Sequence, residues 1–312
     1  MKLLFIVDPL SGLKTYKDTS IAIMREAATS GHTLFVCEQH DVFLRHDIVK
    51  ISAKPFQFST AKNWYELGEN QEYLAKEFDA ILMRKDPPFN NEFLYSTYLL
   101  EMASNQGGRV INNPIGLRGW NEKLSIARFP QFAPTFIVTS QQNLIRDFLI
   151  EHQDIIVKPL DGMGGSNIYR LTQTDPNISV ILENITDFGQ RTIMVQRYLP
   201  AIKQGDKRII VINGEPLPYA LARIPMAGET RGNLAAGGTG VAQPLTSRDL
   251  EIATSVGKVL KLEGIFLAGL DVIGDYLTEI NVTSPTGMVE IATQTNCNAA
   301  QVFIKALEST AK

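Results

Sequence analysis

The architecture of this chain is set by the segment Leu270-Asp271-Val272-Ile273-Gly274-Asp275-Tyr276-Leu277-Thr278-Glu279-Ile280-Asn281. Strand-forming residues lie on both sides of Gly274-Asp275, a pair typical of a tight turn, so the pattern predicts a β-hairpin over 267–282. Because side chains alternate between the two faces of a strand, Glu279 and Asn281 share one face. Buried carboxylates need a compensating partner, so the acidic residues of this hairpin are candidates for a site.

The side on which Asp271 lies depends on the loop of the hairpin. A loop of Gly274-Asp275 alone pairs Asp271 with Thr278 and turns it away from Glu279, whereas a loop over 274–276 pairs it with Glu279. Two carboxylates and an amide on one face suit Mg²⁺, which also takes water and phosphate oxygens. The metal hypothesis therefore predicts the three-residue loop. The alternative is a solvated hairpin with ordinary exposed charges, which the apolar neighbours on both strands disfavour.

The composition is that of a globular protein that acts on small molecules. The 312 residues are 44% hydrophobic and 20% charged, so the chain can bury a full core and divide into two or three lobes. A formal net charge of -3 gives no electrostatic reason to expect nucleic acid or an anionic membrane as partner. The only cysteines, Cys37 and Cys297, are read as free thiols that suit a reducing cytoplasm.

The opening residues predict a strand, because the apolar run 3–7 stops at Asp8-Pro9 before it is long enough for a signal peptide. No run approaches the roughly 20 apolar residues of a membrane-spanning helix. Up to about residue 120, strand patterns at 33–37, 80–83 and 110–112 alternate with helical patterns at 20–30 and 92–104, which predicts an α/β sheet. Further on, we expect strands at 155–159, 193–198 and 208–212, a turn at Asn213-Gly214, and helices at 248–263 and 299–308.

The segment Lys158-Pro159-Leu160-Asp161-Gly162-Met163-Gly164-Gly165-Ser166 places a lysine at a strand end before a glycine-rich loop. The backbone amides of such a loop can form a nest around phosphate oxygens. The loop is not a Walker A loop, because no Gly-Lys-Ser/Thr follows. It also does not match the dinucleotide-binding motif Gly-x-Gly-x-x-Gly, because Asn167 stands where the third glycine is needed, and this disfavours a nicotinamide enzyme. A tight turn that needs positive φ is the structural alternative, and Lys158 favours phosphate binding.

Arginine supplies a third group, made of Arg208, Arg223 and Arg231. The planar guanidinium group of arginine can donate two parallel hydrogen bonds to a phosphate or carboxylate group. Arg231 belongs to the glycine-rich run 228–238, a candidate lid that could close over an acyl phosphate and exclude water. Taken alone, this run is more typical of a surface loop with an incidental arginine.

Together the motifs resemble one family. Met83-Arg84-Lys85-Asp86-Pro87-Pro88-Phe89 and the runs 158–166, 228–238 and 277–286 are similar, in this order, to prokaryotic glutathione synthetase. The resemblance implies a preATP-grasp α/β lobe over 1–120. Behind it would follow an ATP-grasp module of two α+β lobes over 121–312, a central lid lobe of about 121–200 and a C-terminal lobe of about 201–312. It also implies a homotetramer that ligates γ-glutamylcysteine to glycine through an acyl phosphate, releasing ADP and phosphate.

The resemblance also implies residue roles. ATP phosphates would be bound by Lys123, Lys158, Gly162, Gly164, Gly165 and Ser166. The adenine hinge would be Gln196, Arg197, Tyr198 and Leu199, with Asp206 near the ribose. Mg²⁺, or Mn²⁺, would be held by Asp271, Glu279 and Asn281, and the phosphoryl group and intermediate would be steadied by Arg208, Arg223 and Arg231.

Two features depart from the family pattern and put the acceptor amine in question. Family members often carry a basic residue where this chain has Thr239, and the segment from Gly287-Met288-Val289-Glu290 onward diverges. The alternatives are an ATP-grasp ligase with a different amine or carboxylate substrate, and a non-catalytic ATP-binding regulatory protein. The complete set of lysines, metal ligands and lid arginine favours an enzyme.

Overall fold

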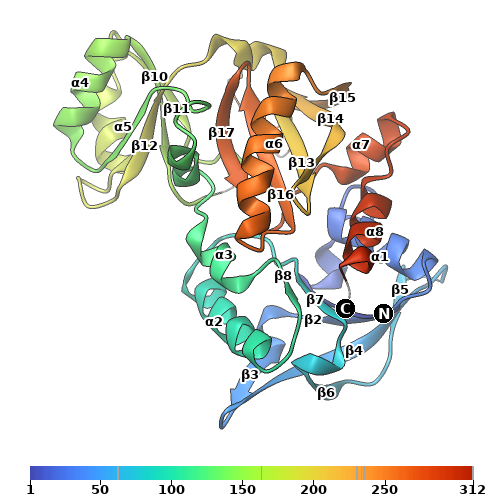
Figure 1. The fold of residues 1–312 in the computed structure, drawn as a ribbon. Helices are drawn as coiled ribbons and strands as arrows, with labels where there is room; N and C mark the ends of the chain where they lie inside the picture. The colour runs from blue at the N-terminus through green and yellow to red at the C-terminus, as the bar shows by residue number, and fades with distance from the viewer. Residues whose placement is uncertain (62, 163, 230, 233, 235–236, 311–312) are drawn as a thin grey trace.

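The computed structural model describes residues 1–61, 63–162, 164–229, 231–232, 234 and 237–310. Its strands form three sheets (Figure 1), in agreement with the predicted mixture of α/β and α+β structure. In the described residues, short 3₁₀ helices lie at Leu10–Gly12, Gln39–Asp41, Ala75–Glu77, Leu124–Arg128 and Pro200–Gln204.

The first sheet contains β1 (Lys2–Ile6), β2 (Thr33–Cys37), β3 (Val42–Arg45), β4 (Ile48–Phe58), β5 (Tyr65–Leu67), β6 (Gln71–Leu74), β7 (Ala80–Met83) and β8 (Val110–Ile111). Its helices are α1 (Thr19–Thr29), α2 (Asn91–Asn105) and α3 (Pro114–Gly119). Strand β1 pairs in parallel with β2 and β7 and is buried on both faces. Leu4 packs in the cluster that contains Phe93 of α2, whereas Phe5 packs with Met24 of α1. A strand covered on both faces reads as a continuous apolar run.

The second sheet is smaller and contains β9 (Phe136–Thr139), β10 (Asp154–Pro159), β11 (Tyr169–Thr172) and β12 (Ile193–Arg197). Helices α4 (Gln142–His152) and α5 (Ile178–Ile185) cover one face, where Val157 and Val195 join their core. Because strand side chains alternate, Lys158 and Gln196 lie on the opposite face. Figure 1 shows this part set to one side of the molecule.

The third sheet contains β13 (Asp206–Ile212), β14 (Glu215–Ile224), β15 (Thr239–Pro244), β16 (Leu267–Ile273) and β17 (Tyr276–Asn281). Helix α6 (Ser247–Leu262) covers the face that carries Ile209 and Val211. The other face carries Ile210 and Ile212, which pack in the same cluster as buried residues of α7 (Met288–Gln294) and α8 (Ala299–Ser309). Helix α8 lies beside α1, so residues near the end of the chain return to the first sheet (Figure 1).

The hairpin of β16 and β17 confirms the predicted pairing but not the predicted loop. Asp271 lies directly opposite Glu279, as the metal hypothesis requires. The loop is nevertheless Gly274-Asp275 alone, since Ile273 pairs with Tyr276, so the three-residue loop is wrong. The register shifts between Asp271 and Val272, where Thr278 is the extra residue on β17. Such a bulge puts two residues opposite one and so returns Glu279 to the face of Asp271.

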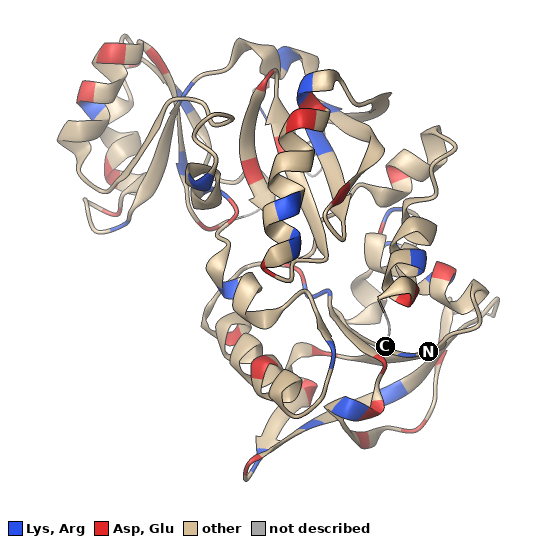
Figure 2. Ribbon diagram, in the orientation of Figure 1, with Lys and Arg blue, Asp and Glu red and all other residues tan. Residues whose placement is uncertain are grey.

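Three further expectations concern membrane spans, the distribution of charge and the cysteines. Among the described residues, no helix combines the length and the apolar character needed to cross a membrane. Basic and acidic positions are interspersed along the helices and strands (Figure 2), in keeping with the small net charge. Cys37 and Cys297 are both free thiols, as predicted.

Candidate active site

A row of charged side chains crosses the third sheet on the face opposite α6. Neighbouring strands contribute Arg223 of β14, Asp206 and Arg208 of β13, Asp271 of β16, and Glu279 and Asn281 of β17. The register accounts for the row, because Asp206 is paired with Arg223, and Asp271 lies between Arg208 and Glu279. The sheet therefore brings together residues that are far apart in the sequence.

Asp271 is held by two arginines at the centre of this row. Its carboxylate accepts Arg208 Nε at 2.5 Å and Nη2 at 3.0 Å, and Arg223 Nη2 lies 2.8 Å from Oδ2. Burial alone would raise the pKa of the Asp271 carboxyl, but these two guanidiniums lower it well below its usual range. Asp271 is therefore ionised at neutral pH and fixes both arginines in place.

Gly269 makes room for the stem of Arg208. A Cβ at Gly269 would lie 2.8 Å from Arg208 Cδ and 3.0 Å from Pro285 Cβ, closer than side chains pack. Arg208 also donates through Nη1 to the carbonyl of Thr286, at 3.4 Å. The absence of a side chain at Gly269 thus lets the arginine pass between β16 and the segment that follows β17.

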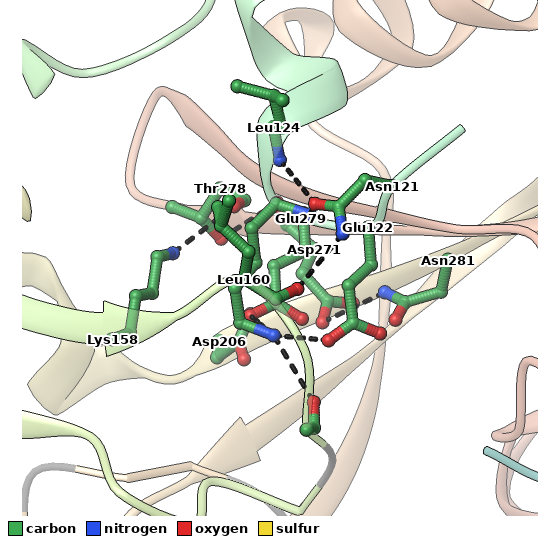
Figure 3. A network of polar contacts seen from close by, with 12 residues as sticks. Asn121, Glu122, Leu124, Lys158, Leu160, Asp206, Asp271, Thr278, Glu279 and Asn281 are labelled. Atoms are coloured by element: carbon green, nitrogen blue, oxygen red, sulfur yellow. Dashed lines mark hydrogen bonds and ion pairs between the residues drawn. The ribbon is translucent and has the colours of Figure 1, made fainter. Parts of the chain in front are cut away.

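At the other end of the row, Glu279 lies beside Glu122 (Figure 3) and near Lys123. Lys123 Nζ lies 3.8 Å from Glu279 Oε1, donates to the Gly162 carbonyl at 3.2 Å, and is bonded to Glu122. Burial raises the pKa of Glu122 to about 7, with further repulsion from Glu279. Burial lowers the pKa of Lys123, but Glu279 and Glu122 outweigh it, so the lysine stays charged.

The carboxylates of this face fit a divalent cation. Burial also raises the pKa of Asp206 to about 7, and within the described part of the chain Asp206 Oδ1 lacks a hydrogen-bond partner. A dication would relieve this crowding of negative charge. The described residues contain no three His, Cys, Asp or Glu side chains that could hold a metal by themselves. Asp271, Glu279 and the Asn281 amide, whose Nδ2 lies 3.4 Å from Asp271 Oδ2, would thus need phosphate or water oxygens to complete the coordination.

Lys158 reaches this face from the second sheet. Its Nζ donates to the Thr278 carbonyl at 3.4 Å, at the bulge of β17 (Figure 3). Burial lowers its pKa, and the negative charge of Glu279 opposes that effect. The bulge that returns Glu279 to the site thereby also supplies the acceptor that positions Lys158.

The glycine-rich loop after Lys158 and the glycine-rich run that contains Arg231 lie close to each other. Gly162, Gly164 and Gly165 have φ values of 116°, 69° and 80°, the left-handed region that glycine adopts readily. Arg231 Nη1 donates to the Gly165 carbonyl at 3.4 Å, and its Nη2 lies 2.6 Å from Glu229. Met163 of the loop, and Thr230, Asn233, Ala235 and Ala236 of the run, lie outside the described residues.

The predicted hinge residues lie at the end of β12. Gln196 is buried, and its Oε1 has no hydrogen-bond partner among the described residues. Arg197 is exposed and lies 3.5 Å from the hydroxyl of Tyr276. Tyr198 and Leu199 are buried. The orphaned oxygen of Gln196 faces away from α4 and α5, on the same side of the sheet as Lys158.

A cavity of about 400 Å³ lies in front of the charged row. One part of its wall consists of predicted site residues and Glu122, namely Lys123, Gly162, Gly164, Gly165, Ser166, Arg208, Arg223, Glu279 and Asn281. The other part includes Lys14, Lys17 and Asp18 from the segment before α1, and Asp86 from the segment after β7. Lys158, Asp206, Asp271, Arg231 and 196–199 lie outside these walls.

Two family models and several relatives are similar to this chain. Residues 1–118 match the model of the prokaryotic glutathione synthetase N-terminal domain, and residues 122–296 match that of the prokaryotic glutathione synthetase ATP-grasp domain. The chain belongs to the prokaryotic glutathione synthetase family. It is 56% identical over 312 residues to the glutathione synthetase of Nitrosomonas europaea, with 99% of this chain and 98% of the relative covered. The corresponding identity to the glutathione synthetase of Bordetella parapertussis is 52% over 317 residues, with 100% of both covered.

Solved structures agree on the fold of this glutathione synthetase family member. D-cycloserine synthetase DcsG superposes with a TM-score of 0.70 at 15% identity, over 99% of this chain and 100% of the other. The ATP-grasp ligase PsnB, complexed with minimal precursor, Mg and ADP, gives 0.63 at 14% identity, over 99% and 97%. The predicted ATP-grasp architecture is confirmed, and the chain is an ATP-dependent ligase.

The sequence patterns assign no role to Glu122, although it adjoins Lys123. They also assign none to Lys14, Lys17, Asp18 and Asp86, which reach the cavity only because the first sheet lies against the third. The spacing of residues along the sequence cannot reveal this contact, because it joins distant segments. For example, Arg84 Nη2 donates to the Pro285 carbonyl at 3.1 Å, although the two residues are 201 positions apart.

The raised pKa of Glu122 gives a prediction for the ligand-free protein. A folded pKa of about 7, against roughly 4.3 in the unfolded chain, means that stability present below pH 4 is lost as pH rises to 7. Replacing Glu122 by Gln should make the fall of the unfolding free energy with pH shallower, by at most about 1.4 kcal/mol per pH unit. Urea titrations between pH 5 and 8 measure this. The exposed Glu263→Gln is the control, and equal slopes in all three proteins would refute the prediction.

Proposed function

We propose that this cavity joins the cysteinyl carboxylate of γ-glutamylcysteine to the amine of glycine, at the expense of ATP. The observation that carries the proposal is the single cavity in which a glycine loop, Lys123, Glu279 and two fixed arginines face a separate charged wall. Phosphate groups and an amino-acid substrate can thus meet in one place. The family resemblance supplies the identity of both substrates.

The phosphate end of the cavity would position ATP for attack. Lys123 and Lys158 offer cationic donors, and the loop from Gly162 to Ser166 offers backbone amides to the phosphate oxygens. Gln196 Oε1, buried without a partner, would accept a hydrogen bond from the adenine amino group, with Arg197, Tyr198 and Leu199 completing the hinge. Asp206, with one free oxygen, would face the ribose.

The arginines would stabilise the charge that develops during the two steps. The substrate carboxylate attacks the γ-phosphorus of ATP, forming an acyl phosphate and releasing ADP. The amine of glycine then attacks the acyl carbon, loses a proton and expels phosphate. Arg208 and Arg223 are held by Asp271 and so need little reorganisation to bind the phosphoryl oxygens, and Arg231 would add a third contact from the lid.

A divalent cation, Mg²⁺ or Mn²⁺, held by Asp271, Glu279 and Asn281 would neutralise phosphate charge when bound. A carboxylate oxygen has two acceptor sites, and Asp271 Oδ2 already serves Arg208 and Arg223. Asp271 Oδ1 accepts Arg208 Nε, so this oxygen could serve an arginine and a metal together. Ligation of this kind requires the bulge at Thr278, because without it Glu279 and Asn281 would face α6.

We further propose domains over 1–120 and 121–312, the second divided near residue 200, which the three sheets support. Assembly into a homotetramer would follow the family, and light scattering would test it. A cytoplasmic location would keep reduced both the thiol of γ-glutamylcysteine and the free Cys37 and Cys297.

Incubation with ATP, Mg²⁺, γ-glutamylcysteine and glycine tests the proposal, with ADP and the tripeptide followed by mass spectrometry. We expect one tripeptide per ADP, and release of ADP that depends on both substrates. Absence of the tripeptide would reject these substrates. Because Thr239 and the segment after Gly287 depart from the family pattern, a panel of other amines should be run in parallel. Faster ADP release with another amine would reassign the acceptor.

A further inference from the structure

A buried asparagine joins the edge of the first sheet to the edge of the third sheet. Asn112 directly follows β8, an end strand of the first sheet, and is 4% exposed. Its side chain contacts the residues at which β16 begins and the residue after β17, an end strand of the third sheet. No step of the ligation proposed above uses this side chain.

The amide of Asn112 uses its full capacity for hydrogen bonds. Its Oδ1 accepts the backbone amides of Phe266 and Leu267, both at 2.8 Å. Its Nδ2 donates to the Leu267 carbonyl at 2.8 Å and to the Val282 carbonyl at 2.7 Å. An asparagine amide offers two donors and two acceptor sites, so all four are occupied. A buried polar group that is satisfied in this way specifies one arrangement of the chain around it.

The bond to Val282 continues the link between β16 and β17 beyond their last backbone pair. The last paired residues at this end of the hairpin are Gly269 and Asn281. Beyond them, the Asn112 amide donates to the carbonyls of both Leu267 and Val282. Asn281, a proposed metal ligand, is the residue directly before Val282. The position of Asn281 on the sheet therefore depends on the bond from Asn112.

The segment that follows Val282 is also held from the first sheet. Ser284 Oγ donates to the carbonyl of Arg84, the residue directly after β7, at 3.3 Å. Arg84 Nη2 in turn donates to the Pro285 carbonyl at 3.1 Å. Residues 283–287 line the cavity. The first sheet therefore holds both the end of β17 and the part of the cavity wall that follows it.

Close packing fixes the base from which Asn112 reaches the two strands. The backbone amide of the next residue, Asn113, donates to the Gly264 carbonyl at 3.0 Å. A Cβ at Gly264 would lie 2.8 Å from Asn113 Cβ, and a Cβ at Gly116 of α3 would lie 2.6 Å from Ile265 Cδ1. Side chains do not pack this closely, so glycine at both positions lets the start of α3 contact the segment before β16.

We propose that Asn112 is a positioning residue of the ligase, which holds the end of β17 so that Asn281 reaches the metal. The bond to Val282 carries this role, because the other three bonds of the amide end where β16 begins. The inference rests on the proposed function, since it assumes that the charged row of the third sheet holds a divalent cation.

Asn112→Asp separates the two halves of the side chain. A carboxylate can still accept the two backbone amides, but it loses both donors to the carbonyls. We expect the dissociation constant of Mn²⁺ in the presence of ADP, measured by electron paramagnetic resonance, to rise about tenfold, the low end for an indirect partner of a metal ligand. In assays of tripeptide formation, kcat should fall by a similar factor and the Mg²⁺ concentration for half-maximal rate should rise.

Hydrogen exchange gives a readout that needs neither metal nor turnover. In the ligand-free Asn112→Asp protein, backbone amides within 282–287 should exchange faster than in wild type, because the end of β17 has lost its bond to the first sheet. Amides of the second sheet, which Asn112 does not contact, should keep their wild-type rates.

Asn113→Asp is the matched control, because it makes the same substitution one residue away. Asn113 Oδ1 caps α3 by accepting the amide of Ile115 at 2.9 Å, and aspartate caps helices as well as asparagine does. This variant should keep wild-type Mn²⁺ binding, exchange and kinetics. Asn112→Ala removes all four bonds without burying a charge, and it should weaken Mn²⁺ binding as Asn112→Asp does.

Wild-type Mn²⁺ affinity in a folded Asn112 variant would overturn the proposal. Faster exchange throughout the chain with unchanged Mn²⁺ affinity would also overturn it, because it would show that Asn112 only stabilises the fold. A wild-type protein that binds Mn²⁺ with ADP but forms no tripeptide would instead reject the proposed substrates, and the comparison of Mn²⁺ binding between variants would still decide the role of Asn112.

Discussion

Replacement of Glu279 by glutamine should lower kcat by about 10²- to 10³-fold, the range seen when one electrostatic contact to a transition state is removed. Glutamine keeps the size of the side chain but removes one carboxylate of the proposed metal site. It also removes the negative charge 3.8 Å from Lys123 Nζ. Steady-state formation of ADP and tripeptide measures the loss, and the Mg²⁺ concentration for half-maximal rate should rise.

The exposed Glu263→Gln serves as the matched control and should keep wild-type kinetics. Stability should change little in Glu279→Gln, because Glu279 is only half-buried and Lys123 retains its bond to Glu122. Unchanged kinetics at every Mg²⁺ concentration would remove Glu279 from the mechanism.

Replacement of Asp271 by asparagine should destabilise the fold as well as inactivate it. Arg208 and Arg223 are 7% and 6% exposed, and both bind the Asp271 carboxylate. Arg223 would keep Asp206, but among the described residues Arg208 would keep only neutral acceptors, the Thr286 carbonyl and the amide oxygen of the new asparagine. We expect a loss of about 3 kcal/mol in the free energy of unfolding, at the low end for breaking a buried ion pair. Chemical denaturation at pH 7 measures it.

The pH dependence of this loss has a definite sign. The folded pKa of Asp271 is depressed, so its contribution is complete above its unfolded pKa of roughly 3.9 and disappears as pH falls through the folded value. The gap between wild type and Asp271→Asn should therefore persist from pH 8 to 5 and narrow only in acid. A gap that closes near neutral pH would contradict the assignment, and Asp147→Asn should show no gap.

Much of the fold could be predicted because apolar patterns in long elements reflect burial. Strands β2 and β7 and the helix α6 lie within a residue of their predicted limits. The pattern predicts no strand between β2 and β7, yet β3 to β6 lie there. β3, β5 and β6 are short, and β4 is partly exposed. The pairing of the three short strands with β4 depends on contacts between distant residues, which the local pattern of apolar residues does not show.

The candidate site, like the fold, could be predicted from the sequence only in part. Alternation along one strand was enough to place Glu279 on the same face as Asn281, and the pairing of Glu279 with Asp271 is confirmed. Alternation could not reveal the bulge at Thr278, because a bulge breaks the period on which such inference relies. The wall that holds Lys17 and Asp86 was out of reach for another reason, since it is created by packing between sheets.

The contact between α8 and α1 has a consequence for folding during synthesis. Leu3 and Phe5 of β1 leave the ribosome long before Phe303 and Ile304, which help to cover their face. A nascent chain would therefore carry an incompletely covered first sheet until α8 has emerged, even though domains generally fold in order of emergence. Chaperone capture should accordingly be strongest for ribosome-bound chains that stop before α8.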